Sequence, residues 1–203
     1  DLEWQFHLAA EFSIEYPNLL DALRWARSKG NWDVTFKLAE GIWVYPHLIG
    51  LYNELDEILE AAEDAAKQLN DPIKNAKIHL QKGRLAYVRG HFDQIEPHLK
   101  EAEAISLQHK DYVMLGETWW DYLIILLQKR WFVEAENLAT KLYDVGREIS
   151  NPRLTFYGAY RLSSLESFRK NYGKAKEWID VAERWAKETH SERTSSVIMY
   201  RRA

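Results

Sequence analysis

The chain has 203 residues, of which 46% are hydrophobic and 29% are charged, so it is long enough to bury a substantial core. Its formal net charge is −4 and its basic residues are spread along the chain, which argues against nucleic-acid binding. The absence of cysteine excludes disulfides and thiolate chemistry, and no apolar run approaches the roughly 20 residues that a membrane helix requires. We therefore expect a soluble, cytoplasmic protein with no membrane or nucleic-acid partner.

The N-terminal part, residues 1–30, is expected to form a partial helical unit. Apolar residues at helical spacing predict a helix near residues 3–15 and another near residues 18–29. We place a break between them at Pro17, because proline lacks the amide hydrogen that a helix interior needs.

From there on, one interval of forty residues organises the chain. An aromatic column follows this interval, and so does a column of side chains that cap helix N-termini. The aromatic column is Tyr52, Phe92, Phe132 and Tyr172, and the capping column is Asn31, Asp71, Asp111, Asn151 and Ser191. A period of this length predicts stacked supersecondary units, here helical hairpins at 31–70, 71–110, 111–150 and 151–190 and a truncated unit at 191–203.

The unit at 71–110 shows the pattern inside each hairpin. Asp71 and Pro72 are typical of a helix start, and Gly90 is typical of a helix end. After Gly90, apolar residues return at helical spacing and predict a second amphipathic helix. Three columns of this second helix are expected to be buried against neighbouring helices. They are Leu55, Ile95, Ala135 and Ala175; Leu59, Leu99, Ala139 and Ile179; and Ala62, Ala102, Leu142 and Ala182. The sequence thus predicts an all-α solenoid of antiparallel helical hairpins, continuous over residues 1–203.

Since residues 191–203 begin a unit and stop inside it, we expect a fragment of a longer protein.

This repeat resembles the tetratricopeptide repeat with lengthened helices. Gly83 and Trp119 match the glycine and large-residue positions of the first helix, and residues 90–92 resemble the turn followed by an aromatic. The unit departs from the family in its length of forty residues and in Leu123 and Ser163 at the glycine position. The resemblance implies a right-handed superhelix whose first helices, called A helices below, line a concave wall.

A second resemblance concerns residues 15–31 and 36–54. They are similar to the opening of helical sensor arrays in the STAND class of signal-transduction ATPases, which includes NB-ARC-type ATPases and bacterial transcription activators. Glu15, Asn18, Leu19 and Trp25 match that motif, and Trp43 matches its last position. The resemblance implies a domain that binds a protein, a peptide or a small-molecule inducer and controls other domains of the same polypeptide. A stand-alone scaffold for protein complexes is the alternative, and an enzyme built on a helical solenoid is a third.

No catalytic, cofactor or metal motif is found, so we expect a protein that is not an enzyme and has no cofactor. There is no Gly-x-x-x-x-Gly-Lys-Ser/Thr run and no His-Glu-x-x-His pair. We interpret His91 and His98 as surface residues.

The candidate binding residues lie in A-helix columns whose character changes from unit to unit. Columns that are buried against an equivalent neighbour in every unit should carry similar residue types. Columns whose residue types vary are therefore candidates for ligand binding. They predict a patch of aromatic residues and guanidinium groups on the concave face, a composition typical of binding hot spots. The patch consists of Arg84, Tyr87, Trp120, Asp121, Tyr157, Tyr160 and Arg161. Packing between units is the alternative explanation for these aromatics.

Overall fold

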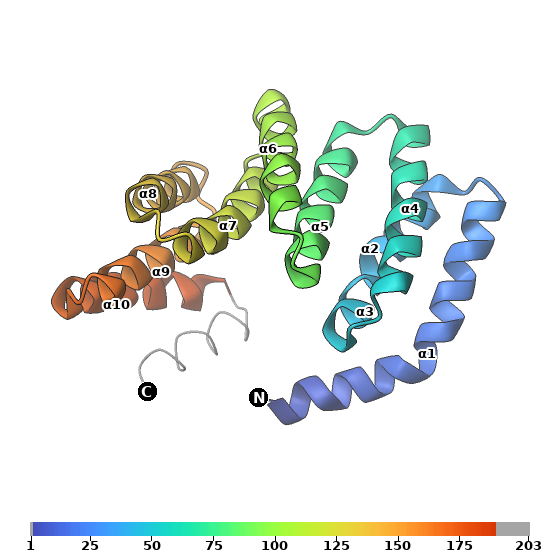
Figure 1. Ribbon diagram of the computed structural model, residues 1–203, viewed down its shortest axis with the longest axis horizontal. Helices are drawn as coiled ribbons and strands as arrows, with labels where there is room; N and C mark the ends of the chain where they lie inside the picture. The colour runs from blue at the N-terminus through green and yellow to red at the C-terminus, as the bar shows by residue number, and fades with distance from the viewer. Residues whose placement is uncertain (1, 190–203) are drawn as a thin grey trace. The chain divides into compact units, whose positions relative to one another are not determined.

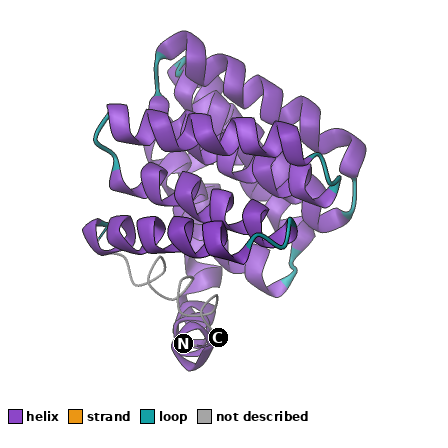
Figure 2. Ribbon diagram, turned by 90° about the vertical axis from the view of Figure 1, so that its left-hand side faces the viewer, coloured by secondary structure: helices purple, strands orange, loops and turns teal. Residues whose placement is uncertain are grey.

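The structure is a computed structural model that describes residues 2–189, and within that range every regular element is a helix (Figures 1 and 2). The helices are α1 (Leu2–Ser28), α2 (Trp32–Ile42), α3 (Val44–Ile49), α4 (Tyr52–Leu69), α5 (Pro72–Arg89), α6 (Phe92–His109), α7 (Tyr112–Gln128), α8 (Phe132–Glu148), α9 (Pro152–Phe168) and α10 (Tyr172–Glu188). This confirms the all-α prediction. The predicted unit at 191–203 and its capping residue Ser191 lie outside the described residues.

The chain divides into two compact units, Asp1–Ile105 and Ser106–Ala203, with the boundary inside α6. In unit 1, α1 packs against α2, α3 and α4, and α4 packs against α5. In unit 2, α9 packs against α7, α8 and α10. Helices that follow one another in sequence thus pack on one another in each unit, as in a helical repeat. One continuous array over the whole chain remains a prediction.

The prediction of a break at Pro17 is wrong, and a break that was not predicted lies near Pro46. Pro17 lies inside α1, which runs unbroken through the predicted gap. A proline removes one amide donor and can bend a helix without ending it, and Figure 1 shows α1 with a bend along its length. Conversely, the first helix of the 31–70 unit is split into α2 and α3. Pro46 follows that break, and its ring nitrogen cannot donate to the carbonyl of Ile42, four residues earlier.

Left-handed backbone residues mark the turns at a constant interval. The residues with positive φ recur every twenty positions, at 30, 50, 70, 90, 110, 130, 150 and 170, and three of these are glycines. Around Asn70, the amide of Asp71 donates to the carbonyl of Ala66 and the amide of Asn70 donates to that of Lys67. These two bonds form a Schellman motif, which satisfies carbonyl groups left over at the helix end.

The predicted caps are formed at most, but not all, of their positions. Asp71 accepts hydrogen bonds from the amides of Ile73 and Lys74, and Asp111 accepts one from Met114. Asn151 accepts one from the amide of Leu154. Asn31 makes no side-chain cap, so the prediction is wrong at that position.

The three predicted core columns are buried in every unit. Leu55, Ala102, Ala139, Leu142 and Ala182, for example, have at most traces of exposed surface. The aromatic column behaves differently, because it stands at the start of each second helix and remains accessible. Phe92 and Tyr172 are 60% and 68% exposed, which leaves these rings available at the surface.

Candidate binding surface on unit 2

The side chains of the candidate surface come from α7 and α9, which pack against each other within unit 2. Gly116 of α7 permits this close approach, since a Cβ at that position would lie 2.5 Å from Cδ2 of Leu154 on α9. Residues 120, 124 and 127 on α7 and residues 157, 161, 164 and 168 on α9 follow helical spacing. They therefore form one stripe on each helix.

Three aromatic residues, two of them members of these stripes, form a cluster where α7 and α9 meet. The rings of Trp120 and Tyr157 are stacked, with centroids 4.3 Å apart and an angle of 30° between their planes. The ring of Tyr160 lies 6.1 Å from that of Trp120. Tyr160 in turn lies 5.9 Å from the buried ring of Phe156, which anchors the cluster in the core. All three residues are half-buried, so each keeps part of its surface accessible.

Two arginines hold this aromatic cluster. The guanidinium carbon of Arg161 lies 3.8 Å from the centroid of the Trp120 ring, a cation–π geometry that fixes the arginine over the indole. At the other end, Nε of Arg153 donates a hydrogen bond of 2.8 Å to the Tyr157 hydroxyl. Arg153 also lies 3.4 Å from a carboxylate oxygen of Glu117 on α7. The cluster is thus tied to both helices.

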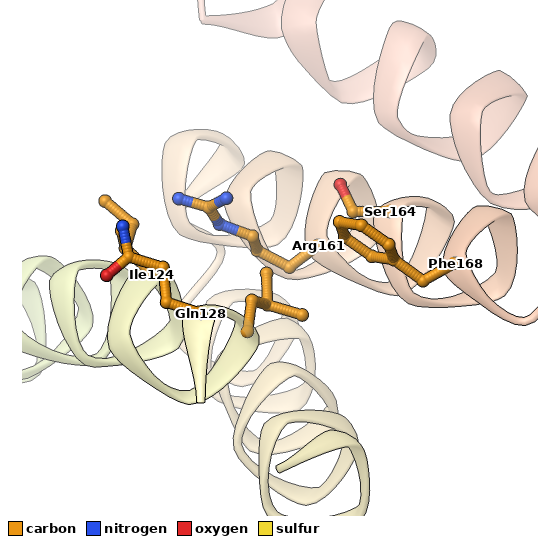
Figure 3. A pocket seen from close by; sticks show the side chains of 6 residues that line it. Ile124, Gln128, Arg161, Ser164 and Phe168 are labelled. Carbon is orange, nitrogen blue, oxygen red and sulfur yellow. The ribbon is translucent and has the colours of Figure 1, made fainter. Parts of the chain in front are cut away.

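A hollow of about 340 Å³ lies beside Arg161 (Figure 3). It is lined by Ile124, Leu127 and Gln128 from α7 and by Arg161, Ser164 and Phe168 from α9. The Ser164 hydroxyl donates a hydrogen bond of 3.0 Å to the Tyr160 carbonyl of its own helix. Most of the exposed surface of the wall is apolar, and the guanidinium group of Arg161 supplies its positive charge.

The structure brings together four of the seven predicted residues, namely Trp120, Tyr157, Tyr160 and Arg161. Asp121 is on α7 and half-buried. Arg84 and Tyr87 are on α5 and belong to unit 1, where the Tyr87 ring lies edge-on to Phe92 at 6.3 Å. One shared patch of all seven residues stays a prediction.

The hollow was not anticipated as such from the sequence. Ile124, Leu127 and Ser164 stand in the varying A-helix columns but were not among the predicted site residues. Gln128 and Phe168 occupy the last position of their helices, four residues after Ile124 and Ser164. That spacing, together with a large aromatic residue at a helix end, is the signal that could have identified them.

The histidines form a separate feature in unit 1. His98 on α6 is half-buried rather than on the surface, and its Nδ1 atom lies 3.3 Å from Nδ1 of His79 on α5. The prediction that His98 is a surface residue is therefore wrong, whereas His91 is exposed. Burial lowers the pKa of both His79 and His98 below the ordinary value for histidine. In the part of the chain that the structure describes, no group of three or more His, Cys, Asp or Glu side chains could hold a metal ion.

Among residues 2–189, no helix combines the length and the apolar character needed to cross a bilayer. No protein-family model matches the chain, and no curated protein matches it.

Proposed function

We propose that this chain is a helical-repeat binding module and that the A helices of unit 2 hold its ligand. In this proposal the hairpins are antiparallel and stack into a right-handed superhelix, so that A helices line one wall. The observation that carries the proposal is the stacked Trp120, Tyr157 and Arg161 cluster beside a hollow with mainly apolar walls. The proposed activity is binding and not catalysis.

The composition and geometry of this surface support recognition. Tryptophan, tyrosine and arginine are enriched among the residues that dominate binding energy. Stacking holds Trp120 and Arg161 in place before a ligand arrives, which reduces the entropy cost of association. The volume of about 340 Å³ is at the lower end of the range for ligand pockets, about 300–1,000 Å³, and suits one or two bulky groups.

We further propose that the module acts as a sensor in a STAND-type signalling ATPase or transcription regulator. The similarity of residues 15–31 and 36–54 to such arrays supports this role. The coding sequence upstream of Asp1 provides a direct test. A phosphate-binding Gly-x-x-x-x-Gly-Lys-Ser/Thr loop followed by a winged helix is expected there. A gene without this loop would favour the stand-alone scaffold.

Ligand binding itself is tested by nuclear magnetic resonance. The amides of Ile124 and Ser164 on the wall of the hollow are followed while the protein is screened against small-molecule fragments and short peptides. Binding ligands are expected to shift these two amides, and the variant Gln128→Trp, which fills the hollow from its edge, should weaken their binding. Lys141→Trp, at an exposed position on α8, is the matched control. If no compound shifts Ile124 and Ser164, the proposed function is wrong.

A further inference from the structure

The two A-to-B turns of unit 2 carry both exposed apolar residues and positive charge. Residues 128–134 comprise the turn from α7 to α8 with the adjoining helix ends, and residues 168–174 comprise the turn from α9 to α10 in the same way. Trp131 is 46% exposed, and Val133, Phe168 and Tyr172 are each more than 60% exposed. These two segments also contain five basic residues and one acidic residue, Glu134. The basic residues are Lys129, Arg130, Arg169, Lys170 and Lys174. We refer to the two segments together as the basic edge.

The two turns lie next to each other in space. The rings of Phe132 and Phe168 are stacked with centroids 5.9 Å apart, and Arg169 lies 2.6 Å from a carboxylate oxygen of Glu136 on α8. Phe168 also lines the hollow beside Arg161. The hollow and the basic edge therefore meet at Phe168 and form one surface.

The nearest carboxylates engage Arg169 and leave other basic residues of this edge exposed. Arg169 binds both Glu136 and Glu166, at 2.6 Å and 3.0 Å, and its hydrogen bond lowers the pKa of Glu136 and keeps that group ionised. Arg130, Lys170 and Lys174 remain exposed around this network. The chain as a whole has a net charge of −4, so positive charge is concentrated locally against the overall balance.

Neither the other turns of unit 2 nor the A-to-B turns of unit 1 have this composition. Segments of the same length contain one arginine each, Arg153 in the B-to-A segment at residues 148–154 and Arg89 in the unit 1 segment at residues 88–94. Arg89 pairs with Asp56 as Arg169 pairs with Glu136. Arg169 therefore belongs to a basic position of the repeat. Arg130, Lys170 and Lys174 do not, because Gly90 and Gln94 stand at the corresponding positions of unit 1, so the repeat alone does not explain these three residues.

We infer that the hollow and the basic edge together dock an acidic peptide segment that carries a bulky apolar side chain. The apolar side chain enters the hollow beside Phe168 and Ile124, and flanking carboxylates lie against Arg130, Lys170 and Lys174. This inference rests on the proposed function and specifies its ligand. A peptide is favoured over a nucleic acid because the adjoining hollow has mainly apolar walls and the chain as a whole has a net charge of −4.

Fluorescence anisotropy with labelled probes tests the inference. The first probe is a short peptide rich in Glu and Asp with single Leu and Phe residues. The others are the same peptide with Ser in place of Leu and Phe, the same peptide with Lys in place of the acidic residues, and a single-stranded oligonucleotide. Binding of the first probe alone is expected. It should weaken as the ionic strength rises from about 0.1 M to about 1 M, because exposed charges are screened.

Charge-reversal variants distinguish the effect of the basic edge on peptide affinity from the effect of the protein's net charge. The double variant Arg130→Glu/Lys170→Glu should bind the acidic apolar peptide at least about tenfold more weakly than the wild type, since rim charges steer association and like charges repel. The control Lys141→Glu/Lys187→Glu introduces the same change in net charge at exposed positions outside the edge. It should retain wild-type affinity, and circular dichroism checks that both variants fold.

The outcomes distinguish this inference from the proposed function. Equal weakening in the two double variants, or binding of the oligonucleotide in preference to the peptide, would overturn the acidic-peptide assignment. If the acidic apolar peptide does not bind while other compounds shift the amides of Ile124 and Ser164, the inference is wrong and the proposed function stands. If no compound shifts those amides, both are wrong.

Discussion

Gly158 on α9 faces the backbone of Tyr143 on α8, and a Cβ at Gly158 would lie 2.5 Å from the Tyr143 amide nitrogen. The contact is reciprocal, because Gly146 on α8 faces the backbone of Thr155 on α9 in the same way. The two helices therefore approach each other through two glycines, one from each side. Backbone atoms cannot move aside as a flexible side chain can, so these positions tolerate no added methyl group without a shift of the helices.

Replacing Gly158 by Ala is expected to destabilise the protein by about 1–3 kcal/mol, in spite of the better helix propensity of alanine, because the methyl group overpacks the α8–α9 interface. Urea denaturation measures the change. Gly173→Ala is the matched control, since a Cβ there meets no atom within 4 Å. It should leave stability unchanged or raise it by up to about 1 kcal/mol. A Gly158→Ala protein as stable as the control would mean that the helices separate easily.

The histidine pair of unit 1 predicts a dependence of stability on pH. Burial lowers the pKa of His79 and His98 in the folded state, with further contributions to His79 from Lys82 and to His98 from His79. Glu63 and Glu101 act in the opposite direction on His79. The unfolded state therefore binds protons first as the pH falls. The contribution of these two neutral histidines to the free energy of unfolding is fully present above about pH 6.5, the ordinary pKa of histidine. It is lost as the pH falls through that value toward the lower pKa values of the folded state.

The test compares free energies of unfolding at about pH 7.5 and about pH 5.5, on either side of the ordinary pKa. The double variant His79→Leu/His98→Leu should lose less stability on acidification than the wild type. His91→Gln, which replaces an exposed histidine, should behave as the wild type does. If the double variant is as sensitive to acid as the wild type, other groups cause the dependence.

Helix caps are expected to differ in strength along one column. Asp111→Ala removes the acceptor of the Met114 amide and should cost roughly 1 kcal/mol, as for other N-caps. Asn31→Ala removes a side chain that makes no cap and should cost clearly less. Thermal denaturation of the two variants measures the difference. Equal losses would show that Asn31 caps α2 in solution.

The left-handed turn residues predict a stabilising substitution. Ser150 has a φ of 53°, a conformation that costs a residue with a side chain roughly 1–2 kcal/mol. Ser150→Gly should therefore stabilise unit 2, although the extra freedom of glycine in the unfolded chain offsets part of the gain. Gly90→Ala, at a φ of 77°, should have the opposite effect. Urea denaturation of both variants checks the two signs, and a destabilised Ser150→Gly would contradict the argument.

The forty-residue columns predicted the helices and their buried faces because each repeat buries the same positions against equivalent neighbours, as Leu55 and Ala102 show. The columns did not predict local features such as helix breaks and close contacts between helices. Pro17 and Pro46 have the same chemistry, yet one lies inside a helix and the other follows a helix break, which depends on packing that a periodicity does not record. Gly146 and Gly158 are adjacent only through the fold.

The candidate site was predicted in part for the same reason. Trp120, Tyr157, Tyr160 and Arg161 stand in varying columns of two successive A helices, so their proximity followed from the repeat. The hollow depends on which side chains fill the space between those helices. Phe168 lines it from the last position of α9, where the repeat imposes no pattern.

The left-handed residues recur every twenty positions, whereas the residue columns recur every forty. One helix with its turn thus spans twenty residues, whereas the pattern of side chains repeats only after two helices. In the proposed stack of hairpins, deleting forty residues would remove one hairpin and leave the order of the buried columns intact. Deleting twenty would preserve the spacing of the turns but set an A helix where a B helix belongs, so that the buried columns would no longer face their partners.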